Sequence, residues 1–159
     1  MRHNHMPLLR ERQREWVSPP DCTLLDSSSK QDALTLTKEP RHHILLVDDD
    51  TAVRRCVRLF LEFQGYACTE ATNGIQALEE LGKHNFSLII TDNQMPRLDG
   101  ISFLETYHSQ QPHHRIPAII VTGHLNSALQ SRADKIGITT IFQKPCGFED
   151  LSDAIGKLM

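Results

Sequence analysis

From residue 43 to the C-terminus, short β-like segments alternate with segments in which apolar residues recur at helical spacing. Continuous apolar runs bounded by polar residues are typical of strands buried on both faces of a sheet. The predicted strands cover residues 44–47, 66–70, 86–90, 117–121 and 138–142. The predicted helices cover residues 51–64, 75–81, 101–108, 125–136 and 148–158.

This strict alternation predicts an α/β fold. Strands that alternate with helices form a parallel sheet with helices on both faces, joined by right-handed crossovers. Five such units suit the flavodoxin-like, doubly wound (βα)5 arrangement with a five-stranded parallel sheet in the strand order 2-1-3-4-5. The ligand site of that arrangement lies at the carboxyl ends of strands 1 and 3.

The first predicted helix shows the clearest apolar stripe. Asp50 precedes it and is a suitable N-cap, and Gly65 follows it as a C-cap. We expect the apolar residues of this helix to face the core together, namely Val53, Cys56, Val57, Phe60, Leu61 and Phe63.

Residues 1–41 differ from the rest of the chain and predict a largely disordered N-terminal extension ahead of a domain over 42–159. They contain no glycine, and residues 1–40 hold six Lys/Arg and six Asp/Glu, so the charges of this stretch balance. Polar stretches such as residues 27–32 have nothing to bury. A partner-binding tail anchored by Trp16 is the sharper alternative.

Composition narrows the class of function. The chain of 159 residues has a formal charge of -3 and no long basic run, so we expect no direct binding to nucleic acid. No apolar stretch approaches the roughly 20 residues that span a bilayer. The cysteines show no CxxC spacing and are expected to be buried thiols. The histidines outside the site are expected to be solvated. We expect a cytoplasmic protein without a membrane association.

Polar residues that carry chemistry follow the strands on one edge of the predicted sheet. Asp48, Asp49 and Asp50 follow the first strand, and Thr91 and Asp92 follow the third. Thr122 and Lys144 follow the fourth and fifth strands. The carboxyl ends of parallel strands meet at one edge, so these groups are expected to converge.

Crowded carboxylates repel one another unless positive charge lies among them. Lys144 supplies one charge, and a hard divalent cation with oxygen ligands supplies the rest. Mg²⁺ is the natural candidate, and no His or Cys stands in position to form a zinc site. The structural alternative is that the aspartates are helix N-caps, which we expect of Asp50 alone.

From about His43 to its end, the chain resembles the response-regulator receiver domain of bacterial two-component systems. Five segments carry the resemblance in the correct order: ILLVDDD (44–50), ATNGIQAL (71–78), LIITDNQMPRLDG (88–100), VTGH (121–124) and FQKP (142–145). Each segment alone is a weak signal, and together they are specific.

The resemblance implies a role for each site residue. Asp92 would be the phosphoacceptor, taking a phosphoryl group from the phosphohistidine of a histidine kinase or a histidine phosphotransfer protein. Asp49, Asp92 and the backbone carbonyl of Gln94 would bind Mg²⁺ directly, and Asp48 would bind it mostly through a water molecule. Thr122 and Lys144 would bind the phosphoryl oxygens. Pro145 corresponds to the cis-proline of the family.

The sequence departs from the family at three places. Ile141 stands where receivers usually carry a tyrosine or phenylalanine switch, and Phe142 is one residue off, on the other face of the strand. Ile141 could instead belong to an apolar output face. Cys146 stands where the family often has phenylalanine, and Arg97 where it often has glycine. Gln94 and His124 flank the site and could tune hydrolysis of the acyl phosphate.

Too few residues follow Pro145 for an output domain there, so we expect a partner protein to read the phosphorylated state. Within the family, a diffusible regulator and a relay or phosphate sink remain open. A scaffold with a receiver fold that works without phosphorylation is the non-catalytic alternative. A haloacid-dehalogenase-type phosphatase would need an acid at Gln94, and a flavodoxin would need a phosphate-binding loop in place of the three aspartates.

Overall fold

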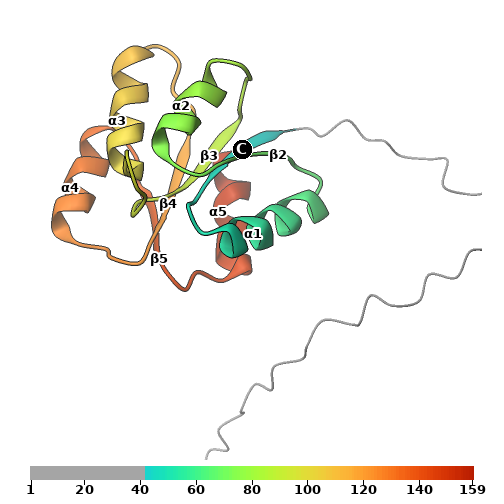
Figure 1. Ribbon diagram of the computed structural model, residues 1–159. Helices are drawn as coiled ribbons and strands as arrows, with labels where there is room; N and C mark the ends of the chain where they lie inside the picture. Colours follow the sequence, from blue (N-terminus) through green and yellow to red (C-terminus); the bar gives the residue numbers. More distant parts are fainter. Residues whose placement is uncertain (1–41) are drawn as a thin grey trace, which may run out of the picture. The chain divides into compact units, whose positions relative to one another are not determined.

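The computed structural model describes residues 42–159 (Figure 1). The extension predicted for residues 1–41 lies outside the described residues. Every predicted strand and helix is present, and strands and helices alternate along the chain. Their bounds are β1 His43–Val47, α1 Thr51–Phe63, β2 Ala67–Ala71, α2 Gly74–Leu81, β3 Leu88–Asp92, α3 Gly100–Gln110, β4 Ala118–Thr122, α4 Ser127–Lys135, β5 Thr140–Gln143 and α5 Phe148–Leu158.

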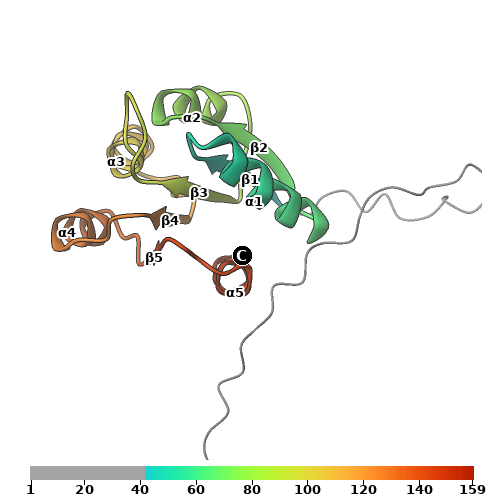
Figure 2. The same cartoon turned by 60° about the horizontal axis from the view of Figure 1, so that its bottom comes forward.

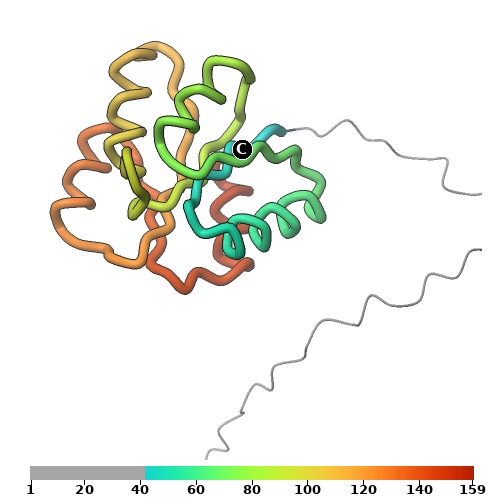
Figure 3. The backbone as a smooth tube through the Cα atoms, in the orientation of Figure 1, coloured from blue at the N-terminus to red at the C-terminus, as the bar shows by residue number. Residues whose placement is uncertain are grey.

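The five strands form one parallel sheet in the order β2-β1-β3-β4-β5, which confirms the predicted topology. The chain path in Figure 3 runs from β1 outward to β2 and then back across β1 to β3. The strand order therefore reverses between β1 and β3. In a doubly wound sheet, this switch point is the expected ligand crevice.

Helices cover both faces of the sheet (Figure 2). α2, α3 and α4 pack over one face, where Leu104 and Ile120 are fully buried. α1 and α5 pack over the other, where Ile44 and Ile119 are fully buried. Alternate residues of each strand therefore enter different cores, as the two-residue repeat of a strand requires.

Polar side chains fix where the helices begin. Asp50 accepts hydrogen bonds from the backbone N–H groups of Ala52 and Val53, which confirms its predicted role as the N-cap of α1. Asn73, Asp99 and Asn126 cap α2, α3 and α4 in the same way.

The stripe predicted for α1 is partly wrong. Leu61 is fully buried, but Phe63 is 90% exposed, and Val53 and Cys56 are also exposed. Arg54 and Arg58 both pair with Glu70 of β2. The side of α1 that carries these arginines therefore faces the edge of the sheet. Hydrophobicity alone does not reveal this rotation, because it ranks both arginines as surface residues.

The thiols and histidines also differ from expectation. Cys56, Cys68 and Cys146 are free thiols, as expected, but Cys56 is exposed and the other two are only partly buried. His108 on α3 is buried rather than solvated.

Candidate functional site

The ends of β1 and β3 lie side by side at the rim of the sheet. Val47, the last residue of β1, pairs with Thr91 of β3, so Asp48 and Asp92 emerge next to each other. The third strand was predicted to end at Ile90, but β3 continues through Asp92. The pairing of β3 with β4 extends to Asp92, which lies opposite Val121. This pairing keeps polar residues in the strand, although the apolar pattern of the sequence stops before them.

Three carboxylates form a cluster at this rim. Asp48, Asp49 and Asp92 each offer an oxygen atom, and these atoms all lie within 4.8 Å of one another. Asp48 and Asp92 are buried, and Asp49 is exposed. Carboxylates this close repel one another, and partly desolvated ones do so more strongly than those in water.

Lys144 reaches the cluster from the residue after β5. Its Nζ lies 2.9 Å from Asp48 Oδ2 and 3.1 Å from Asp92 Oδ2. Burial opposes the charge on this amine, but the hydrogen bonds and negative charges of both carboxylates outweigh it, so the pKa of Lys144 lies above its ordinary value. The lysine is therefore charged at neutral pH. The peptide bond between Lys144 and Pro145 is cis, as expected.

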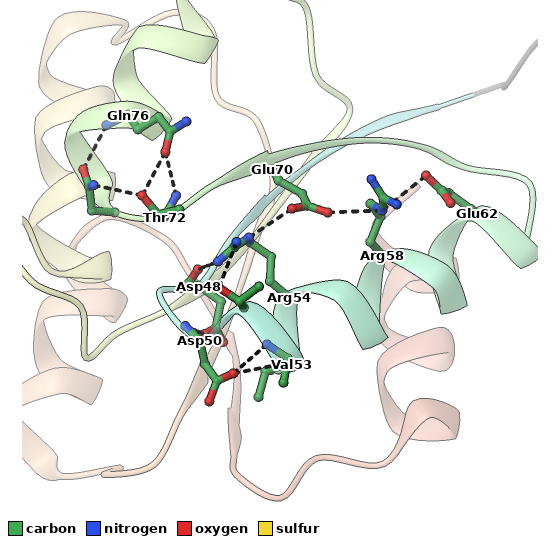
Figure 4. Close-up of polar contacts among 12 residues, drawn as sticks. Asp48, Asp50, Val53, Arg54, Arg58, Glu62, Glu70, Thr72 and Gln76 are labelled. Carbon is green, nitrogen blue, oxygen red and sulfur yellow. Dashed lines mark hydrogen bonds and ion pairs between the residues drawn. The ribbon is translucent and has the colours of Figure 1, made fainter.

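A hydrogen-bond network holds the loop after β1 in place (Figure 4). Asp48 Oδ1 accepts a hydrogen bond of 2.8 Å from the backbone N–H of Asp50. Arg54 Nη1 donates one of 2.8 Å to the backbone carbonyl of Asp48, and Arg54 Nε donates one of 3.1 Å to Glu70. The role of Arg54 could not be predicted from the sequence, because nothing there distinguishes it from Arg55 and Arg58 of the same helix.

Thr122 lies at the end of β4 and is fully buried. Its hydroxyl oxygen accepts a hydrogen bond of 3.2 Å from the backbone N–H of His124. Its carbonyl accepts one of 2.8 Å from the backbone N–H of Lys144, so β4 and the lysine are linked through the main chain.

The loop after β3 packs closely under the acidic cluster. The backbone N–H of Gln94 donates a hydrogen bond of 3.2 Å to Asp92 Oδ1, while the Gln94 side chain is exposed. A Cβ atom at Gly100 would overlap the carbonyl oxygen of Asp92. Only glycine at the start of α3 therefore allows this approach.

β5 presents Ile141 and Phe142 to opposite faces of the sheet. Ile141 is partly buried against the core beneath α2, α3 and α4. Phe142 packs on the core beneath α1 and α5. The aromatic residue therefore does not lie on the face of Ile141, as the strand alternation predicts.

The donor set at the rim suits a hard divalent cation. The cluster offers carboxylate oxygens only, and a small cation with few carboxylate ligands and several waters is the pattern of Mg²⁺ sites. Receiver domains typically bind Mg²⁺ through such acidic residues.

Comparison with known proteins identifies the family. The profile of the response regulator receiver domain matches residues 44–156. The chain belongs to the response-regulator receiver family. The receiver is 34% identical to the response regulator receiver protein CpdR of Brucella abortus over 116 residues, 73% of this chain and 95% of that protein. It is 29% identical to sporulation initiation phosphotransferase F of Bacillus subtilis, again over 73% of this chain and 92% of that protein.

Other relatives are longer. The receiver is 34% identical to the transcriptional regulatory protein FixJ of Bradyrhizobium diazoefficiens over 68% of this chain, but spans only 51% of that protein.

Solved structures agree with the family and the fold. A CheY-like receiver domain protein of Methanospirillum hungatei superposes with a TM-score of 0.68 at 30% identity, covering 74% of this chain and 93% of that chain. The chemotaxis protein CheY4 of Vibrio cholerae gives a TM-score of 0.69 at 26% identity, with coverage of 74% and 98%. Receiver domains are signalling modules of two-component systems, and their partners include histidine kinases.

The helices of residues 42–159 include none that is both long and apolar enough to cross a membrane.

Proposed function

We propose that this receiver takes a phosphoryl group onto Asp92 from the phosphohistidine of a histidine kinase or a histidine phosphotransfer protein, with Mg²⁺ as cofactor. One observation carries the proposal: a buried aspartate at the end of β3 lies within 4.8 Å of two further carboxylates and 3.1 Å from a charged lysine. This arrangement places a nucleophile among groups that can neutralise a phosphoryl group.

The reaction is a transfer between two covalent carriers. A carboxylate oxygen of Asp92 attacks the phosphorus atom, and an acyl phosphate forms as the bond between phosphorus and the imidazole nitrogen breaks. The imidazole leaves with the electron pair of that bond. Phosphoryl transfer spreads negative charge over three oxygens, so catalysis depends on positioning and charge neutralisation rather than on a general base.

The remaining residues divide that work. Asp49, Asp92 and the backbone carbonyl of Gln94 would hold the Mg²⁺ ion directly, and Asp48 would hold it through a water. When bound, Mg²⁺ supplies positive charge to the phosphoryl oxygens. Lys144 then shifts from pairing with two carboxylates to pairing with the phosphoryl group, as a point charge.

The output starts at Thr122. The acyl phosphate adds roughly −1.5 to −2 charge at one point, and the Thr122 hydroxyl would turn from the backbone of His124 to a phosphoryl oxygen. That turn moves the loop after β4. Ile141, partly buried beneath α4, would transmit the change to an apolar output face without an aromatic switch. We place the protein in the cytoplasm, where a separate protein reads this face without direct binding of nucleic acid.

Intact-protein mass spectrometry after incubation with Mg²⁺ and acetyl phosphate tests the proposal. We expect the mass of one phosphoryl group on the wild type and none on Asp92→Asn. Asp99→Asn is the matched control, because Asp99 only caps α3 and asparagine caps equally well. Equal phosphorylation of Asp92→Asn would overturn the assignment. An unmodified wild type that also ignores beryllofluoride would favour the phosphorylation-independent scaffold.

A second pair of variants tests the metal site. Asp49→Asn should weaken Mg²⁺ binding at least tenfold in a calorimetric titration, because it removes a carboxylate of the cluster. Asp50→Asn should not, because Asp50 points its side chain at the start of α1. Equal loss in both variants would mean that net charge rather than coordination controls binding.

A further inference from the structure

A cavity of about 530 Å³ lies between α1, α5 and the sheet, next to the acidic cluster. Its floor is formed by strand residues that include Leu46, Ile90 and Val121. Val53 and Val57 of α1 form one wall, and Cys146 and Phe148 form the other. Pockets that hold small organic molecules have volumes of roughly 300–1,000 Å³ and mostly apolar walls.

The residues of both walls explain why the cavity exists. The buried side of α1 is turned toward Glu70 by Arg54 and Arg58, so the apolar side that carries Val53 faces the cavity instead of the core. On the opposite wall, the small side chain of Cys146 leaves this space open. The stacked rings of Phe60 and Phe148, with centroids 4.6 Å apart, bridge the two helices beside it.

The apolar walls remain in contact with water. Val53 is 37% exposed and Phe148 is 43% exposed, although both line the cavity. An occupant that removed these side chains from water would gain the free energy of apolar burial. The floor residues Leu46 and Ile90 lie beneath the helices and are almost fully buried. A helix laid across α1 and α5 would not reach them, whereas a small molecule would.

The polar end of the cavity indicates the charge of the occupant. Both side-chain oxygens of Asp48 accept hydrogen bonds, from the N–H of Asp50 and from Lys144. Those of Asp92 are paired with the N–H of Gln94 and with Lys144. Each carboxylate oxygen already has a partner, and the two carboxylates together exceed the single positive charge of Lys144, so the end wall disfavours an anionic ligand. A cationic ligand would lose its hydration against the apolar walls, so an uncharged occupant suits the cavity best.

We propose that this cavity is a binding site for a small, uncharged, largely apolar organic molecule. The cavity shares Asp48, Asp92 and Lys144 with the proposed phosphorylation site at its polar end, but binding against its apolar walls does not require phosphorylation.

Indole is a suitable probe, used in a titration of the full chain with labelled Val and Leu methyl groups followed by nuclear magnetic resonance. We expect saturable shifts at Val53, Val57, Val121 and Leu151, which all line the cavity. Cys146→Phe should fill the cavity from one wall and weaken indole binding at least tenfold. Val53→Phe should do the same from the other wall, at an exposed position where the fold tolerates a larger side chain.

Ser131→Phe, on the exposed surface of α4, is the matched control and should bind indole as the wild type does. The proposal is overturned if the wild type shows no saturable shifts up to the solubility of indole, or if both filled variants bind it equally well. Shifts centred instead on Leu59 of the outer surface of α1 would also overturn it. Nuclear Overhauser contacts in the ligand-free protein would overturn it as well, if they joined the cavity methyl groups to a second copy of the chain or to residues before His42.

Discussion

Arg54 links the helix that follows β1 to the loop that carries the acidic cluster. Its guanidinium donates hydrogen bonds to the carbonyl of Asp48 and to Glu70, and it is 8% exposed. Replacing it with leucine leaves the buried carbonyl of Asp48 without its donor and leaves the Glu70 carboxylate paired with Arg58 alone. Loss of hydrogen bonds from a charged group costs about 1.5–3 kcal/mol each.

We therefore expect Arg54→Leu to lower the free energy of unfolding by about 2 kcal/mol, measured by urea denaturation. It should also weaken Mg²⁺ binding, because the loop carrying Asp48 and Asp49 loses its support. Arg55→Leu, at an exposed position on the same helix, should change neither quantity by much. A stable Arg54→Leu variant with normal Mg²⁺ affinity would show that Asp50 alone is sufficient to hold the loop.

Because of His108, the fold should become less stable as the pH is lowered. Its ring is buried on α3, and neither nitrogen has a hydrogen-bond partner among the residues the structure describes. Burial and the charge of Arg115 lower its pKa, and the nearby carbonyl of Ile136 opposes them only in part. Above an ordinary histidine pKa of about 6.5, both folded and unfolded chains are neutral there. Below it, the unfolded chain takes up a proton before the folded chain does. The free energy of unfolding therefore decreases as the pH is lowered.

His108→Leu should remove this dependence. Between pH 7 and pH 5, the free energy of unfolding should fall less in the variant than in the wild type, in parallel denaturation series. His113→Leu, in the exposed loop after α3, is the control and should keep the wild-type slope. Identical slopes in wild type and His108→Leu would place the acid sensitivity elsewhere.

At the scale of residues, the sequence predicted the acidic groups and Lys144 because a chemical pattern marks each of them. It did not predict the burial of Arg54 or His108, since a charged or titratable side chain in a helix is ordinarily exposed. Their burial depends on which side of the helix meets the sheet, which the rest of the fold decides.

Among the elements, the turn from β3 into α3 is the most tightly constrained. The N–H of Gly100 donates a hydrogen bond of 3.1 Å to the carbonyl of Asn93, and its Cα faces the backbone of Asp92 without room for a side chain. Gly100→Ala should cost about 1–3 kcal/mol, the range typical of overpacking. It should also impair phosphorylation, because the clash displaces the main chain of the phosphoacceptor.

Gly156→Ala is the matched control for this change. Gly156 lies in α5, and a Cβ atom there meets nothing within 4 Å. Alanine should stabilise that helix by roughly 0.5–1 kcal/mol, because glycine loses more backbone entropy on folding. Thermal denaturation of both variants measures the pair of effects. If Gly100→Ala changed neither the stability nor the phosphorylation of the protein, the turn could open to accommodate a side chain.

The sequence predicted the elements themselves better than their ends. The bounds of α5 match the prediction, 148–158, because its apolar residues stay in phase throughout. α4 was predicted from Leu125 but begins at Ser127, because Asn126 caps it by accepting a hydrogen bond from the N–H of Leu129. Hydrogen bonds between neighbouring strands fix where a strand ends, and capping side chains fix where a helix begins. Hydrophobic periodicity reveals neither kind of hydrogen bond.

For the molecule as a whole, one sheet separates two cores and carries the site at its rim. The strands of that sheet contribute alternate residues to both cores, so neither core persists without it. A ligand that binds only the folded chain stabilises it by about 2.7 kcal/mol at 100 times its dissociation constant. If the described domain unfolds as one unit, this stabilisation must appear equally in both cores.

Hydrogen exchange of backbone amides with and without saturating Mg²⁺ and beryllofluoride measures this. We expect slower exchange by a common factor at Leu104 of α3 and at Ile155 of α5, which are buried on opposite faces. Asp92→Asn should abolish the part of the change that depends on beryllofluoride. Protection confined to one face would show that the helices of the other face open independently of the sheet, and the acyl phosphate could then signal through only half of the domain.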